Sequence, residues 1–171
     1  MSARSRCFDM GFFGLFSPAK KTDAAFGEVV YRRGAWNGDV SIAGLHDERI
    51  ALEIETAKDS DLSKFQSILN CVRKNVETIK DQIAQEAFST YRRYIEEDRK
   101  AGNFTNADYS IYPAVTSVAD IWRVLSPFRL TMTDAVADYN AMLWLDVDWP
   151  NPHYFVACLD GARLYQLEVE G

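Results

Sequence analysis

A stripe of apolar side chains at helical spacing constrains the fold more than any other feature. Residues 62–83 carry apolar side chains at steps of three and four, which places them on one face of an α-helix. The seven members are Leu62, Phe65, Leu69, Val72, Val76, Ile79 and Ile83. Side-chain oxygens at 59–61 favour a helix start there, and Gly102 favours an end. Such a helix needs an apolar surface to cover, so the rest of the chain must supply one.

The predicted helical segment extends to about residue 100, because Tyr91, Tyr94 and Ile95 continue its apolar face. One straight helix of about 40 residues would measure about 60 Å, which exceeds a domain of this size. We therefore predict a kink or break near Gln85–Ser89. An alternative use of the stripe is the seam of a two-chain coiled coil, which would make the protein a helix-mediated homodimer.

Segments rich in β-forming residues precede and follow this helical segment. Before it, alternation of polar and apolar side chains predicts strands at 26–33, 39–43 and 49–56, with turns at 34–38 and 44–48. After it, the pattern predicts a short helix at 116–125, then strands at 128–133, 142–149, 153–159 and 163–170. Asp160-Gly161 signals a hairpin, and the broken alternation over Tyr165–Leu167 indicates a bulge.

This order of elements predicts an α+β fold. We expect an antiparallel sheet built from the N- and C-terminal strands, covered on one face by a long, kinked helix and a short second helix. A chain of 171 residues suits one domain. We assign residues 24–171 to that domain and residues 1–23 to a tail. The apolar cluster at 12–16 is too short to span a bilayer.

Charge and cysteine usage narrow the class of partner. The chain has 25 acidic and 19 basic residues, a net charge of −6, which disfavours nucleic acid and anionic membranes. Three scattered cysteines without metal or redox spacing favour a reducing, cytoplasmic compartment. There is no Gly-rich phosphate loop and no nucleophile elbow. We therefore expect no cofactor and no metal, and we expect a protein as partner.

The candidate site residues lie around the Pro150–Pro152 turn. Asp146 and Asp148 are two residues apart in a predicted strand, so their side chains point the same way. With His153 they are candidates for a metal-dependent or acid–base hydrolase, although a solvated strand face explains them as well. Trp149 and Tyr154 flank the turn as aromatic anchors of a binding surface. The predicted binding set is Asp146, Asp148, Trp149, Asn151, His153 and Tyr154, with no catalytic residue and no metal ligand.

The layout also resembles a family. Its pieces are a Trp36-Asn-Gly turn between early strands, a long helix ending near Tyr91 and Tyr94, and Asp146-Val-Asp-Trp before His153-Tyr-Phe-Val and a terminal hairpin. Together they resemble small bacterial domains of the polymorphic-toxin immunity type. The resemblance implies a stoichiometric, non-enzymatic binder of a toxin in the bacterial cytosol, and it transfers no catalytic residue. Pro150-Asn-Pro departs from the acidic stretch that is common in related domains.

Overall fold

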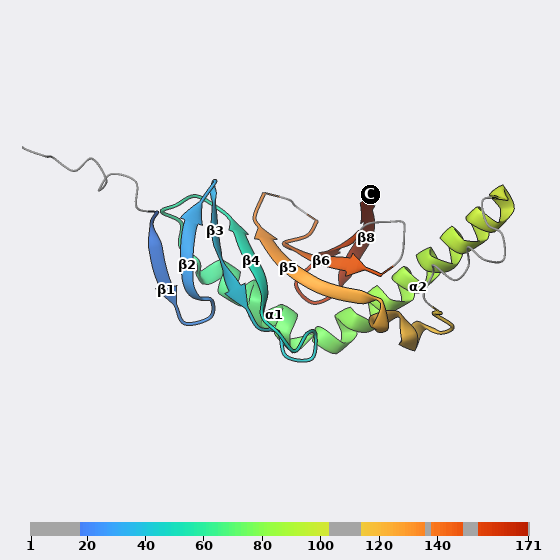
Figure 1. Ribbon diagram of the computed structural model, residues 1–171. Helices are drawn as coiled ribbons and strands as arrows, with labels where there is room; N and C mark the ends of the chain where they lie inside the picture. Colours follow the sequence, from blue (N-terminus) through green and yellow to red (C-terminus); the bar gives the residue numbers. More distant parts are fainter. Residues whose placement is uncertain (1–17, 103–113, 136–137, 149–153, 171) are drawn as a thin grey trace, which may run out of the picture.

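The computed structural model describes residues 18–102, 114–135, 138–148 and 154–170. Within these residues, eight strands form one sheet in chain order, from β1 at one edge to β8 at the other (Figure 1). The strands are β1 (Lys20–Asp23), β2 (Gly27–Arg32), β3 (Ala35–Val40), β4 (Ile50–Glu55), β5 (Leu125–Thr133), β6 (Ala141–Val147), β7 (Tyr154–Leu159) and β8 (Leu164–Glu170). The helices are α1 (Ser63–Lys74), α2 (Val76–Ala101) and the 3-10 helix η3 (Val118–Arg123).

The sheet joins the two ends of the chain, as the α+β prediction requires. β1–β4 and β5–β8 are antiparallel meanders. They meet at β4 and β5, which pair in parallel, so the sheet is mixed rather than wholly antiparallel. The parallel pair follows from the connection between these strands, because α1, α2 and η3 carry the chain back to the end where β4 began.

The predicted kink near Gln85–Ser89 is wrong, because α2 runs through this stretch without a break. The helical segment is interrupted at Asn75 instead. The Asn75 side-chain amide donates to the Cys71 carbonyl oxygen at 2.8 Å. Its backbone N–H lies 3.1 Å from the carbonyl oxygens of both Cys71 and Val72. A polar side chain that bonds to the preceding turn competes with helix propagation, which explains the break.

The apolar stripe lies in the core of this chain. Six of its seven side chains are buried and Val76 is partly buried against the same cluster. The cluster includes strand residues such as Leu52, Ile54 and Leu143, and Figure 1 shows α1 and α2 running along one side of the sheet. We call this side the inner face and the opposite side the outer face. Because the stripe packs against its own sheet, it is not free to form a seam with a second chain.

The first hairpin differs from its prediction. Of residues 34–38, expected as a turn, 35–38 belong to β3, and the connection is the two-residue turn Arg33-Gly34. Both turn residues have positive φ, 53° and 89°, as a type I′ turn demands. The sequence pattern pointed to the wrong residues because Arg is an uncommon choice for such a turn. Lys20–Asp23, assigned to the tail, form the edge strand β1.

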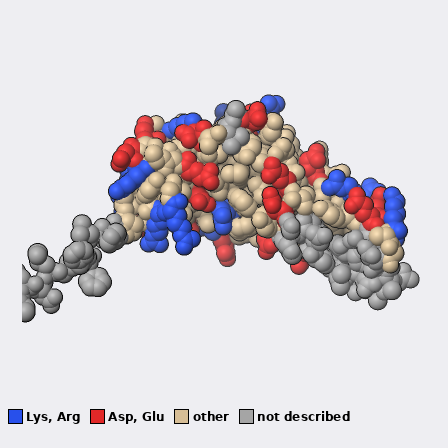
Figure 2. Space-filling model, turned by 90° about the horizontal axis from the view of Figure 1, so that it is seen from above, with Lys and Arg blue, Asp and Glu red and all other residues tan. Residues whose placement is uncertain are grey.

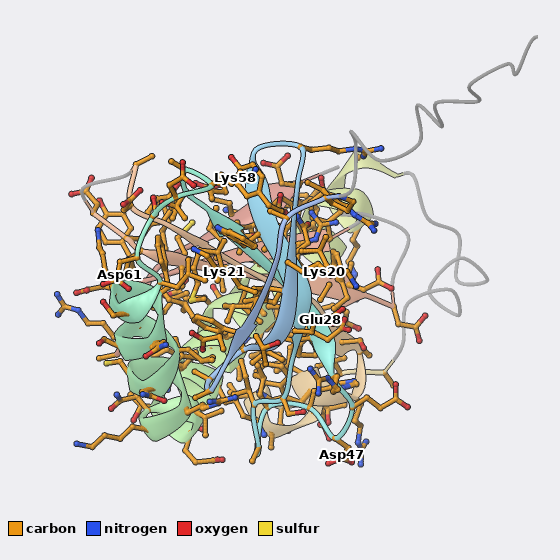
Figure 3. All side chains as sticks on the ribbon, turned by 90° about the vertical axis from the view of Figure 1, so that its left-hand side faces the viewer. Lys20, Lys21, Glu28, Asp47, Lys58 and Asp61 are labelled. Atoms are coloured by element: carbon orange, nitrogen blue, oxygen red, sulfur yellow. The ribbon has the colours of Figure 1, made fainter. Side chains whose placement is uncertain are left out.

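Two lysines, Lys20 and Lys21, lie on the edge strand β1. Figure 3 looks onto β1 and labels Lys20, Lys21 and the neighbouring Glu28 of β2. Lys20 Nζ lies 3.1 Å from Glu28 Oε1. Lys21 Nζ donates to the Ser60 carbonyl oxygen and lies 4.6 Å from the Trp36 ring centroid. Charged side chains on an edge strand hinder pairing with another sheet. None of the described helices is both long and apolar enough to span a membrane.

Candidate functional site

The strand register places one row of side chains across the outer face. Ala51 of β4 pairs with Arg129 of β5, Arg129 pairs with Trp144 of β6, and Trp144 pairs with Val156 of β7. Residues paired in this way point to the same side of a sheet and contact each other. The neighbours of Ala51 along β4 that point inward, Ile50 and Leu52, belong to the core cluster. The row therefore lies on the face away from α1 and α2.

Arg129, Trp144 and Tyr154 form a continuous stack in and beside this row. The Arg129 guanidinium carbon lies 5.3 Å from the Trp144 ring centroid, and the Tyr154 ring centroid lies 5.6 Å from that of Trp144 with the two rings tilted by 41°. The Trp144 indole N–H donates to Thr131 Oγ1 at 3.1 Å. Thr131 is buried, so this bond fixes the indole plane against a rigid strand. We call these three side chains the outer stack; each is partly exposed.

A hollow of about 490 Å³ adjoins the outer stack over β2–β5. Three arginines line it, namely Arg32, Arg33 and Arg129, together with Asn37 and Glu53. Arg129 Nη1 lies 3.8 Å from Glu53 Oε2, whereas Arg32 and Arg33 make no ion pair with any residue in the described ranges. Figure 2, seen from above the view of Figure 1, shows Lys and Arg side chains gathered toward the β1–β4 end of the molecule, beside Asp and Glu.

The hairpin that carries two of these arginines is held rigidly. Asn37 Nδ2 donates to the carbonyl oxygens of Arg32 and Ala35 at 3.3 and 2.9 Å, which ties β3 to both sides of the turn. Arg33 is the only described residue other than glycine with a positive φ. That backbone conformation is unfavourable for a side chain with a Cβ. The turn therefore presents the Arg33 side chain from a strained position.

Beyond the outer stack, the outer face holds a buried thiol. Cys158 is fully buried, and burial together with the nearby Glu168 carboxylate raises the pKa of its thiol to about 11. Burial also raises the pKa of Tyr139, whose hydroxyl is hydrogen-bonded to Cys158. A thiol with so high a pKa stays protonated at neutral pH and is a poor nucleophile. Cys158 is therefore part of the packing beneath this face.

The predicted site residues are only partly brought together. Asp146 and Tyr154 pair across β6 and β7 on the outer face. The Asp146 carboxylate accepts a hydrogen bond from the Val147 N–H at 3.1 Å. Asp148 follows the end of β6, where its backbone N–H donates to the Val124 carbonyl oxygen. Trp149, Asn151 and His153 lie outside the described residues. Within the described ranges, no group of three or more His, Cys, Asp and Glu side chains has the geometry of a metal site.

Residue patterns alone do not reveal the hollow. Arg32-Arg33 reads as a short basic pair before a turn, and Arg129 and Trp144 read as ordinary strand residues. Their proximity depends on the parallel pairing of β4 with β5, which lie about 75 residues apart in the chain. The one available signal is Arg at a hairpin position that usually takes Asn, Asp or Gly.

The fold and the outer face define a small α+β domain with one mixed sheet, with α1 and α2 running along one side of it and a polar–aromatic surface on the other. Residues 25–160 match the family described as Domain of unknown function (DUF6985). The chain belongs to this family, and the matched range includes every residue of the outer stack and of the hollow. No curated protein and no solved structure gave a match.

Proposed function

We propose that this chain is a non-enzymatic module of the bacterial cytosol that binds a partner protein through the outer face of its sheet. The outer stack is the observation that carries the proposal. Trp, Tyr and Arg are the side chains most enriched among residues that dominate protein–protein binding energy. Here they are contiguous, partly exposed and pre-oriented, with 5.3 Å from the Arg129 guanidinium carbon to the Trp144 ring centroid and 5.6 Å between the Trp144 and Tyr154 ring centroids. Pre-orientation reduces the entropy that is lost on association.

The resemblance to immunity domains suggests the kind of partner. An immunity-type protein neutralises a toxin by occupying its surface in a fixed ratio, and a rigid sheet face suits that task because its side chains need little rearrangement. A rigid, strand-borne surface also places its anchors more precisely than a loop would. We therefore propose a toxin as the partner and a one-to-one complex as the product.

In the described part of the chain, the side chains that a hydrolase would use are less favourably arranged for their role than the outer stack is for binding. Acid–base catalysis by paired carboxylates needs each of them within hydrogen-bond reach of the proton that it transfers. One Asp146 oxygen accepts its own neighbour's backbone N–H, and Asp148 stands beyond the strand end. No observation on the described residues favours this alternative over the binding role.

The proposal is tested by co-purification from cells of the source organism with an affinity-tagged chain. We expect one protein to be retained in stoichiometric amount, with a complex mass by light scattering equal to the sum of one copy of each. Trp144→Ala should reduce retention at least tenfold, because hot-spot truncations cost about 2 kcal/mol or more. Trp122→Ala, which truncates a partly buried tryptophan of η3, is the matched control and should retain the partner.

Three outcomes would overturn the proposal. One is the absence of any stoichiometric partner from cells that produce the chain at its natural level. Another is equal retention by wild-type protein and Trp144→Ala, provided that circular dichroism shows both folded. Loss of the partner in Trp122→Ala alone would place the interface on the wrong side of the molecule and would equally contradict it.

A further inference from the structure

We infer that the hollow lined by Arg32, Arg33 and Arg129 is the anion-binding subsite of the outer face and takes an acidic segment of the partner protein. This inference rests on the proposed function, since it names the chemistry of the partner at that surface. The expected ligand groups are Asp and Glu carboxylates, whose two oxygens match the paired N–H donors of a guanidinium. The outer stack would then contact the apolar part of the same partner.

The charges in the hollow are unbalanced. Three guanidinium groups line it, against one carboxylate, that of Glu53. The Glu53–Arg129 contact is long, at 3.8 Å, and both side chains are partly exposed. Each guanidinium has five N–H donors and no acceptor, so most donors remain available to a ligand. Trp144 on one side and Glu53 on the other hold the Arg129 group in place.

The conformation of Arg33 gives an independent argument. It occupies the first position of a type I′ turn with φ of 53°, where Asn, Asp or Gly is strongly preferred. Its side chain makes no ion pair or hydrogen bond within the described ranges that would compensate for the unfavourable backbone. The turn imposes this φ on whichever residue stands there, but it does not require that residue to be Arg, and unfavourable residues at such positions are typical of functional sites. The residue is thus better explained by a ligand than by the turn.

The overall charge distribution selects the source of the anion. The chain carries a net charge of −6, and in Figure 2 acidic side chains lie beside the basic ones on the surface. A long polyanion such as RNA or DNA would be repelled by these surroundings. A short run of carboxylates can enter the hollow without extending over the acidic surface. An acidic protein segment therefore fits better than a nucleic acid.

The closing experiment titrates the full chain with a blocked hexaglutamate peptide at low salt and follows the arginine Nε–H signals by NMR. We expect the signals of Arg32, Arg33 and Arg129 to shift and that of Arg92 to stay fixed. Arg92 is an exposed arginine of α2, paired with Glu96. Arg33→Gln should weaken peptide binding about tenfold, as loss of a charge-assisted hydrogen bond implies. Arg92→Gln removes the same charge and should weaken binding less than twofold.

A second variant separates binding from folding. Arg33→Asn supplies the preferred turn residue, so we expect the melting temperature to rise by about 2–4 °C while peptide affinity falls about tenfold. A lower melting temperature in Arg33→Asn would show that Arg33 serves the fold, and would overturn the inference.

The other outcomes are equally decisive. Equal peptide affinity in Arg33→Gln and Arg92→Gln would overturn the subsite, as would tighter binding of a six-nucleotide single strand than of the peptide. If the peptide fails to bind while Trp144→Ala still loses the cellular partner, the acidic-segment inference is wrong and the proposed function stands. If Trp144→Ala still retains the cellular partner, the proposed function is wrong, and the inference that rests on it is lost with it.

Discussion

The two faces of the sheet are made from alternate residues of the same strands, yet they are built on different principles. Along β4, Ile50, Leu52 and Ile54 point inward and are almost completely buried, whereas the intervening positions are exposed or partly so. The inner face meets α1 and α2 through a continuous apolar core. The outer face carries guanidinium, carboxylate, hydroxyl and indole groups that are held by specific hydrogen bonds and ring contacts.

The difference separates a face that specifies the fold from a face whose chemical groups suit recognition. Apolar contact is non-directional and tolerates exchange among similar side chains, so the inner face specifies the fold. Polar and aromatic groups on the outer face have defined orientations and unused donors, which suits recognition. A substitution on the inner face should therefore change the free energy of unfolding more than a substitution on the outer face does.

The largest expected effect belongs to Leu69→Ala on the inner face. Leu69 is fully buried in α1, and the substitution removes apolar contacts and leaves a cavity. We expect the free energy of unfolding to fall by about 3 kcal/mol in urea titrations. Ser67→Ala, at an exposed position of the same helix, is the control and should change it by less than about 0.5 kcal/mol. Similar losses in both variants would contradict the role of the stripe as a sheet cover.

The stability of the protein at high pH tests the buried Cys158 thiol of the outer face. The Cys158 pKa is about 11 in the folded chain and ordinarily 9.0. Between these values the unfolded chain releases the thiol proton and the folded chain keeps it, so stability is complete below pH 9 and falls as pH rises toward 11. We expect a loss of about 1–2 kcal/mol over this range. The free energy of unfolding of the Cys158→Ala variant should fall less over the same pH range. If it falls with pH as steeply in the variant as in the wild-type protein, Cys158 is not the group responsible.

Trp144→Phe probes the orientation of the outer stack. Phenylalanine keeps an aromatic ring but loses the N–H that donates to buried Thr131 Oγ1. Because the hydroxyl is left without this partner, we expect the free energy of unfolding to fall by about 1 kcal/mol. Adding Thr131→Val to Trp144→Phe should restore part of the loss, as a double-mutant cycle would reveal. Strictly additive losses would mean that the two side chains are not coupled.

The smallest effect is expected at the edge of the sheet. Lys20 and Glu28 form an exposed ion pair, with side chains 60% and 62% accessible. Such pairs contribute little because water already solvates both charges. Lys20→Ala should change the free energy of unfolding by less than about 0.5 kcal/mol in the same urea assay. A change above about 1 kcal/mol would place β1 among the elements that determine stability rather than at a dispensable edge.

Local sequence patterns were informative about the secondary-structure elements and much less so about how these elements contact one another. The periodicity of 62–83 correctly predicted helical structure with one buried face, although this stretch is divided between α1 and α2. Asp160-Gly161 correctly marked the last hairpin. The predicted bulge is confirmed, since the register between β7 and β8 skips Tyr165. The position of the helix break was missed, because Asn75 acts through bonds to Cys71 and Val72 that helical periodicity does not reveal.

By itself, the sequence determined the kinds of elements and their apolar faces, because hydrophobic periodicity and turn chemistry act over a few residues. It also determined the net charge that disfavours polyanionic partners. Only the tertiary structure decided that β4 pairs in parallel with β5, since that contact depends on the crossover through α1, α2 and η3. That pairing brings Arg129 to Arg32 and Arg33, which lie almost a hundred residues away in the chain, so the basic hollow exists only in the folded molecule.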